Sequence, residues 1–155
     1  MIIADVLAYK GHKIETVFPH DRLGQIAQIF DQRNISSVVV VSPGGMPLGI
    51  VTDRVLIKAI AKSGLAGLSM PVSDVMTTPV PTCSPEETIQ KALLVMTDLR
   101  VRHLLVKSGS RMVGLISIGD LVKYRLRDSD LESRVLRELA YGRLAEASLE
   151  THVPG

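Results

Sequence analysis

Apolar residues follow the same order twice along this chain. Two segments have the i, i+3, i+4, i+7 spacing of a helix with one buried face, and their apolar members are Leu23, Ile26, Ala27 and Phe30 in the first copy and Ile89, Ala92, Leu93 and Met96, 66 residues later, in the second. A run rich in Val or Leu, typical of a buried strand, follows each helix at residues 38–41 and 104–106. A period of this length that occurs twice predicts two halves packed face to face, with a ligand-binding cleft between them.

Each half is predicted to contain a short extended segment, a helix, two strands and a second helix. In the first half these elements are residues 14–17, 19–32, 38–41, 48–51 and 53–62, and in the second half residues 80–82, 85–99, 104–106, 113–116 and 118–127. A further helix is predicted from Ser129 and a frayed tail from Gly142. The expected fold is therefore α/β, with a first repeat at residues 1–62, a linker at 63–73, a second repeat at 74–127, and a C-terminal helix and tail at 128–155.

Composition limits the class of protein more than it indicates a function. The 155 residues are 46% hydrophobic, which is enough for a core, and their net charge of +2 with 3% aromatic residues gives no support to nucleic-acid binding. Cys83 is the single cysteine, so an intramolecular disulfide is excluded, and we expect a small buried residue there. No apolar run reaches the roughly 18 residues of a membrane span, and no secretory signal is visible at the start. We expect a cytoplasmic protein that does not contact membranes.

The segment from Gly114 to Asp120 carries the most chemical information. A strand is expected to end before Ser117 and a helix to begin after it, so Ser117 and Asp120 resemble a capping box at a helix start. The same geometry would let the Asp120 carboxylate accept two hydrogen bonds from the cis-diol of a ribose, while Ser117 and the helix N-terminus meet phosphate oxygens. Gly49 and Gly114, before the two strand ends, allow another backbone or a ligand to approach closely. The residues alone leave the capping and the nucleotide interpretations both open.

The segment at 114–120 has a counterpart 65 residues earlier, beginning at Gly49. This repeated Gly-aliphatic-aliphatic-Thr/Ser-x-x-Asp block, after a Val-rich strand and a glycine turn, resembles the cystathionine-β-synthase (CBS) domain. Two copies, from about Lys10 to Arg127, resemble the tandem CBS pair known as a Bateman module. The resemblance implies a β-α-β-β-α unit per repeat, a pseudo-twofold pair and two clefts. It also implies that the clefts bind adenosine-containing ligands such as AMP, ADP, ATP, NAD or S-adenosylmethionine, usually for regulation.

The resemblance further assigns roles to residues that match the family's pattern. It implies that Asp120 holds the ribose diol, that Ser117 contacts the ribose or phosphate, and that Leu115 and Ile116 lie along the adenine. Around the same ligand it places two further groups, Lys10, Gly11, Ile35 and Ser36 as a wall from the first repeat, and Arg102 and His103 facing phosphate. A solvated cation for Arg102 and a packed structural role for His103 stay open.

The first repeat departs from this pattern. Val55 stands where the second repeat has Asp120, and valine cannot bind a diol. Asp53 lies two positions earlier, about 200° round a helix, and cannot take its place. Thr52 and Arg54 are left to contact a phosphate. We therefore expect one ordinary nucleotide site per chain, centred on Asp120, and a weaker second cleft.

These residues distinguish three classes of function. The preferred hypothesis is a non-enzymatic regulatory module that binds an adenine nucleotide (AMP, ADP, ATP or NAD), needs no cofactor or metal, and signals to an unidentified regulated protein. The alternative is a dimerisation or protein-interaction module with vestigial nucleotide sites. An enzyme is disfavoured because no set of nucleophile, base and orienting group emerges, and no Gly-rich phosphate loop is present.

The family resemblance also implies a homodimer. Leu131, Val135, Leu136 and Leu139 share one face of the C-terminal helix. This face either packs on its own subunit or forms a dimer contact. The basic stretch from Lys123 to Arg127 is interpreted as a solvated helix face, and His12, His20 and His152 are expected on the surface.

Overall fold

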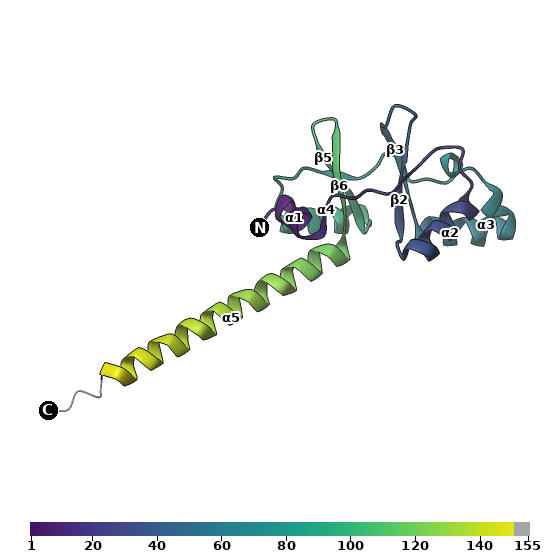
Figure 1. Ribbon diagram of the computed structural model, residues 1–155. Coiled ribbons are helices and arrows are strands. Elements are labelled where there is room, and N and C mark those ends of the chain that lie inside the picture. The colour runs from purple at the N-terminus through teal and green to yellow at the C-terminus, as the bar shows by residue number, and fades with distance from the viewer. Residues whose placement is uncertain (151–155) are drawn as a thin grey trace. The chain divides into compact units, whose positions relative to one another are not determined.

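The computed structural model describes residues 1–150, which form two compact units. The first unit, Met1–Ile118, holds the sheets of both repeats, and the second starts at Gly119 and contains the C-terminal helix. Figure 1 shows two small sheets in the first unit, each accompanied by helices. The predicted α/β class with two similar halves and a C-terminal helix is confirmed. His152 lies outside the described residues.

Each repeat contains a three-stranded sheet of the same topology. The strands are β1 (Thr16–Val17), β2 (Ser37–Val41) and β3 (Pro47–Thr52) in the first sheet, and β4 (Thr82–Cys83), β5 (His103–Ser108) and β6 (Arg111–Ser117) in the second. In both sheets the first strand pairs parallel with the second, which pairs antiparallel with the third. The register shifts at matching places, after Val40 and after Val106. The internal repeat therefore extends to the irregularities of the strands.

The helices of the two repeats also match. They are α2 (Leu23–Arg33) and α3 (Asp53–Ser63) in the first repeat, and α4 (Ile89–Leu99) followed by α5 (Ile118–Glu150) in the second. Leu23, Ile26 and Phe30 are buried on α2, as are their counterparts on α4, so the predicted helix faces are confirmed. Both α2 and α4 begin about four residues later than predicted, because Pro19 and Pro85 lie in turns ahead of the helices.

The two sheets pack against each other through one face of each. Val39, Val41 and Ile50 of the first sheet form a buried cluster with Leu105 and Leu115 of the second. The all-aliphatic faces of β2 and β5 thus provide the contact between repeats, and burial of such side chains contributes roughly 1.5–3 kcal/mol each. The predicted face-to-face packing of two halves agrees with this cluster.

An N-terminal helix, α1 (Ile3–Lys10), is not among the predicted elements. Its residues Ile3 and Leu7 are buried, and it packs on the second repeat rather than the first. The amide of Ile3 donates to the Glu87 carbonyl and that of Ala4 to the Pro85 carbonyl, each at 2.9 Å. Only eight residues long, the helix shows too few turns for an apolar period to stand out in the sequence.

The segment between the repeats packs on the first repeat, whereas α1 packs on the second. Two short 3₁₀ helices, η1 (Gly64–Ser69) and η2 (Val72–Asp74), form where the sequence predicts a linker. The Val72 amide donates to the Asp21 carbonyl at 2.8 Å, and Val72 is fully buried in the core of the first repeat. Each repeat is therefore completed by the residues that precede the other one in sequence.

The two strand glycines are explained by this exchange. A Cβ on Gly114 would lie 2.5 Å from Leu7 Cδ2, and a Cβ on Gly49 would lie 2.5 Å from Met76 Sδ. The close approach predicted at these glycines is present, but the approaching group is a side chain and neither a backbone nor a ligand.

The second unit consists of one helix where two are predicted. Helix α5 continues without a break through Ser129 and Gly142 and ends at Glu150 (Figure 1). No proline occurs between residues 118 and 150, and single Ser, Asp or Gly residues cost a helix only about 0.5–1 kcal/mol each. The polar Asp128–Asp130 segment and Gly142 are therefore tolerated inside the helix. Within residues 1–150 no helix is long and apolar enough to cross a membrane.

Candidate functional site

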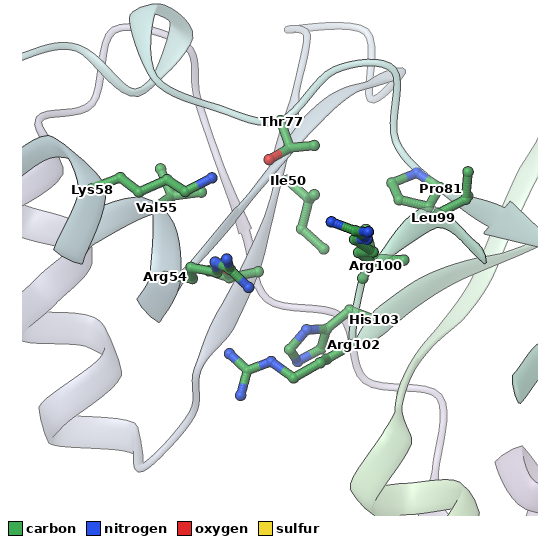
Figure 2. Close-up of a pocket in the computed structure, with 12 residues that line it drawn as sticks. Ile50, Arg54, Val55, Lys58, Thr77, Pro81, Leu99, Arg100, Arg102 and His103 are labelled. Carbon is green, nitrogen blue, oxygen red and sulfur yellow. The ribbon is translucent and has the colours of Figure 1, made fainter. Parts of the chain in front are cut away.

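A pocket of about 380 Å³ lies between the two repeats in the first unit. This volume is within the range of small-molecule sites. Its lining residues come from β3, the first half of α3, the segment before β4, the end of α4 and the residues that lead into β5, and Figure 2 labels ten of them. The twelve lining residues are Ile50, Thr52, Arg54, Val55, Lys58, Thr77, Pro81, Leu99, Arg100, Val101, Arg102 and His103.

A backbone hydrogen bond at the junction of β3 and α3 fixes the chain beside the pocket. Thr52 is the last residue of β3 and the N-cap of α3, and the amide of Asp53 donates to the Ser36 carbonyl at 3.1 Å. The second repeat has the same link, because the Ile118 amide donates to the Arg102 carbonyl at 2.9 Å. These bonds join the residues before the second strand of each repeat to the end of its third strand.

The pocket is strongly positive. Arg54, Lys58, Arg100 and Arg102 line it, and none of the twelve lining residues carries a carboxylate. Figure 2 shows Arg54 and Lys58 on the first-repeat side, facing Arg100 and Arg102 on the second-repeat side. Because cations from both repeats face one space, the pocket is suited to an anionic ligand that touches both.

One of these cations is partly neutralised from outside the pocket. Arg102 Nη2 lies 2.9 Å from Asp53 Oδ1, and the same oxygen accepts the Arg54 amide at 2.9 Å. The Asp53 carboxylate is thus engaged at the helix start. Val55, which is 9% exposed and packs in the first repeat's core, forms the wall at this point.

Two residues predicted for the cleft of Asp120 line this pocket. Arg102 and His103 are assigned by the resemblance to the cleft of Ser117 and Asp120, but they line the pocket with Thr52 and Arg54. The residues before β5 line the pocket with the end of β3, and they are also bonded to the end of their own sheet, because the Arg102 carbonyl accepts the Ile118 amide and His103 pairs with Ser117. His103 is buried, which agrees with a packed role.

Several residues predicted for the other cleft lie at equivalent places. Lys10 Nζ donates to the Leu115 carbonyl, so the end of α1 meets β6. Leu115 and Ile116 are buried on β6, while Gly11 follows α1 with a φ of 105°. Ile35 and Ser36 precede β2 as Val101 and Arg102 precede β5. Ser117 ends β6 and Asp120 lies in the first turn of α5, in the second unit.

Known proteins resemble this chain in sequence and in fold. The model of the CBS domain matches residues 5–62 and 72–127. The chain belongs to the CBS-domain family. The predicted tandem CBS pair is thereby confirmed, and each match covers one of the two sheets, the second match ending within α5.

Individual relatives are similar in sequence, in fold or in both. The solved structure of a CBS-domain containing protein from Agrobacterium tumefaciens is 40% identical, with a TM-score of 0.78 over 80% of this chain and 92% of that one. A mitochondrial CBS domain-containing protein of Arabidopsis thaliana is 33% identical over 129 residues, which are 78% of this chain and 63% of the relative. The chain thus spans less than two thirds of the Arabidopsis protein.

A more distant CBS domain pair has been solved in complex with 5′-methylthioadenosine and S-adenosyl-L-methionine. It is 20% identical, with a TM-score of 0.72 over 83% of this chain and 98% of that one, and so shares the fold. Within residues 1–150 of the present CBS pair, no three His, Cys, Asp or Glu side chains are grouped to hold a metal ion.

Cys83 in the second CBS repeat is buried, as predicted, and is expected to be unreactive in the folded protein. Burial, with a smaller contribution from the Glu87 carboxylate, raises the pKa of its thiol to about 12. At pH 8 the native thiol is therefore protonated, whereas the unfolded thiol, with a pKa near 8.5, is partly ionised. Iodoacetamide labelling followed by mass spectrometry should be slow in buffer and fast in denaturant. Rapid labelling of the native protein would contradict the burial of this side chain.

Proposed function

We propose that this chain is a non-enzymatic regulatory module that binds an adenine nucleotide between its two CBS repeats. The observation that carries the proposal is the pocket in which cations from both repeats face one space beside an apolar wall. Phosphate groups suit Arg54, Lys58, Arg100 and Arg102, and an adenine ring suits Ile50, Val55 and Leu99. The adenosine ligands of the distant CBS pair support the same ligand class.

A ligand in this position would act as a link between the repeats. It would contact α3 of the first repeat and the residues before β5 of the second at once. Binding would then favour the arrangement in which both sets of cations reach the phosphates, and the free energy of that preference is the regulatory signal. We propose that the signal passes to a separate regulated protein.

Titration calorimetry on nucleotide-free protein tests the proposal, with AMP, ADP, ATP and NAD as probes. Lys58→Ala is expected to weaken binding of a nucleotide in the pocket by about 1–2 kcal/mol, because a charge-assisted hydrogen bond to phosphate is lost. Lys62→Ala is the matched control, since Lys62 is exposed one turn further along α3 and does not line the pocket. If none of the four nucleotides binds, the proposal is wrong.

Self-association is a second candidate function, favoured by the apolar residues of α5. Leu131, Val135, Leu136 and Leu139 are 47–66% exposed. Such a run of exposed aliphatic residues is typical of a surface that another helix covers. We propose that it contributes to a homodimer. Sedimentation of the wild type and of Leu136→Glu tests this: the wild type should be dimeric and the variant shifted to monomer, and a monomeric wild type would reject it.

A further inference from the structure

We infer that the pocket at the end of β3 recognises its nucleotide by the phosphates and not by the ribose hydroxyls. Its preferred ligand class is therefore a nucleoside di- or triphosphate, bound equally well as the ribo- or the deoxyribonucleotide. The inference rests on the proposed function and names the ligand class of one of the two clefts.

The lack of ribose recognition is inferred from Val55 and Asp53. A side chain that grips a cis-diol must accept two hydrogen bonds, which a carboxylate does best. Val55 occupies the wall at the third position of α3, and the carboxylate of Asp53, at the first position of the same helix, lies 2.9 Å from the Arg102 guanidinium. Among the lining residues, the neutral hydroxyls of Thr52 and Thr77 and the ring of His103 are the side-chain acceptors. Loss of one ribose hydroxyl therefore removes no charged interaction.

Phosphate recognition is inferred from three lining cations that have no carboxylate partner within residues 1–150. Within residues 1–150, Arg54, Lys58 and Arg100 form no ion pair, whereas Arg102 is held by Asp53. Three such charges on two sides of one pocket repel each other until an anion neutralises them. Each further phosphate of a nucleotide adds negative charge within reach of the set, so affinity should rise from mono- to triphosphate.

Arg100 is the lining cation whose replacement can keep the backbone unchanged. Its φ is 53°, in the left-handed region, where Asn is enriched and other side chains are uncommon. The equivalent position of the first repeat holds Asn34, with a φ of 51°. Both residues are the C-caps of their helices, α4 and α2, where a left-handed conformation is common, so this backbone conformation belongs to the helix end and Arg100 contributes its positive charge to the pocket.

The experiment compares ATP, 2′-deoxyATP and AMP by titration calorimetry in an Asp120→Ala background, which removes the carboxylate predicted for the other cleft. We expect ATP and 2′-deoxyATP to bind within threefold of each other, and AMP at least tenfold more weakly. Arg100→Asn should weaken ATP at least fivefold without lowering the thermal midpoint, because asparagine tolerates this backbone conformation. Arg111→Asn, at an exposed position outside the pocket, is the matched control.

The outcomes separate this inference from the proposed function. Deoxyribose discrimination of tenfold or more, or AMP binding as tight as ATP, would overturn the inference while leaving nucleotide binding intact. Binding by the wild type that vanishes in Asp120→Ala would also overturn it, because the nucleotide would then occupy only the other cleft. Absence of binding to the wild type would reject the proposed function itself, and the inference with it.

Discussion

Replacing Asp120 with alanine is expected to weaken AMP binding by about 2–4 kcal/mol, which is the largest effect on function expected of a single residue. Asp120 lies in the first turn of α5, three residues after Ser117, the last residue of β6. A carboxylate there can accept two charge-assisted hydrogen bonds from a ribose diol, and removing both accounts for the magnitude. Titration calorimetry with AMP measures the loss.

Two comparisons distinguish a ligand contact at Asp120 from a purely structural role. An acidic residue in the first turn stabilises a helix by about 0.3–1 kcal/mol, so Asp120→Ala should lower the thermal midpoint slightly whatever its role. Asp120→Asn keeps the shape and one acceptor oxygen, and should therefore give an intermediate loss of affinity. A lower midpoint with unchanged AMP affinity would show that Asp120 only caps the helix.

The largest effect on stability is expected from Leu7→Ala, which should lower the free energy of unfolding by about 2–5 kcal/mol. Leu7 is 1% exposed on α1, and its methyl groups lie where a Cβ on Gly114 would be. Truncation leaves a cavity between α1 and β6, because Gly114 has no side chain that could fill it. Chemical denaturation measures the change, and hydrogen exchange should show the first loss of protection in β6.

Leu65→Ala is the matched control for this substitution. Leu65 is 80% exposed in η1, so the same deletion of side-chain atoms should change stability by no more than about 0.5 kcal/mol. A loss of less than 1 kcal/mol for Leu7→Ala would mean that α1 contributes little to the second repeat.

The sequence was sufficient to predict the elements that repeat. The apolar faces of α2 and α4 and the aliphatic strands β2 and β5 were correct because their periodicity is local and each copy supports the other. Helix α1 was missed because its partner, β6, lies more than a hundred residues away in sequence. The break predicted in α5 was wrong because polar residues within a helix lower its propensity without ending it.

The candidate site was predictable in its residue types and not in its grouping. Thr52, Arg54 and Val55 were found because they stand out against the second copy of the motif. Arg102 and His103 line the pocket with Thr52 and Arg54, and their assignment to the cleft of Asp120 stays a prediction, since the choice between two clefts depends on how the sheets pack. Arg100 and Lys58 carry no motif, and only their position in the pocket identifies them.

The exchange of leading segments between the repeats has a consequence for the order of folding during synthesis. The first repeat needs Val72 and Met76, which follow it, and the second needs Leu7, which the ribosome makes more than a hundred residues before Gly114. Neither half is complete when its own sheet is complete: the first repeat requires synthesis to reach about Met76, and the second requires a helix that is made before the first repeat. A nascent chain shorter than about 114 residues must keep the apolar face of α1 without its partner β6, which makes this stage the one most exposed to misassembly.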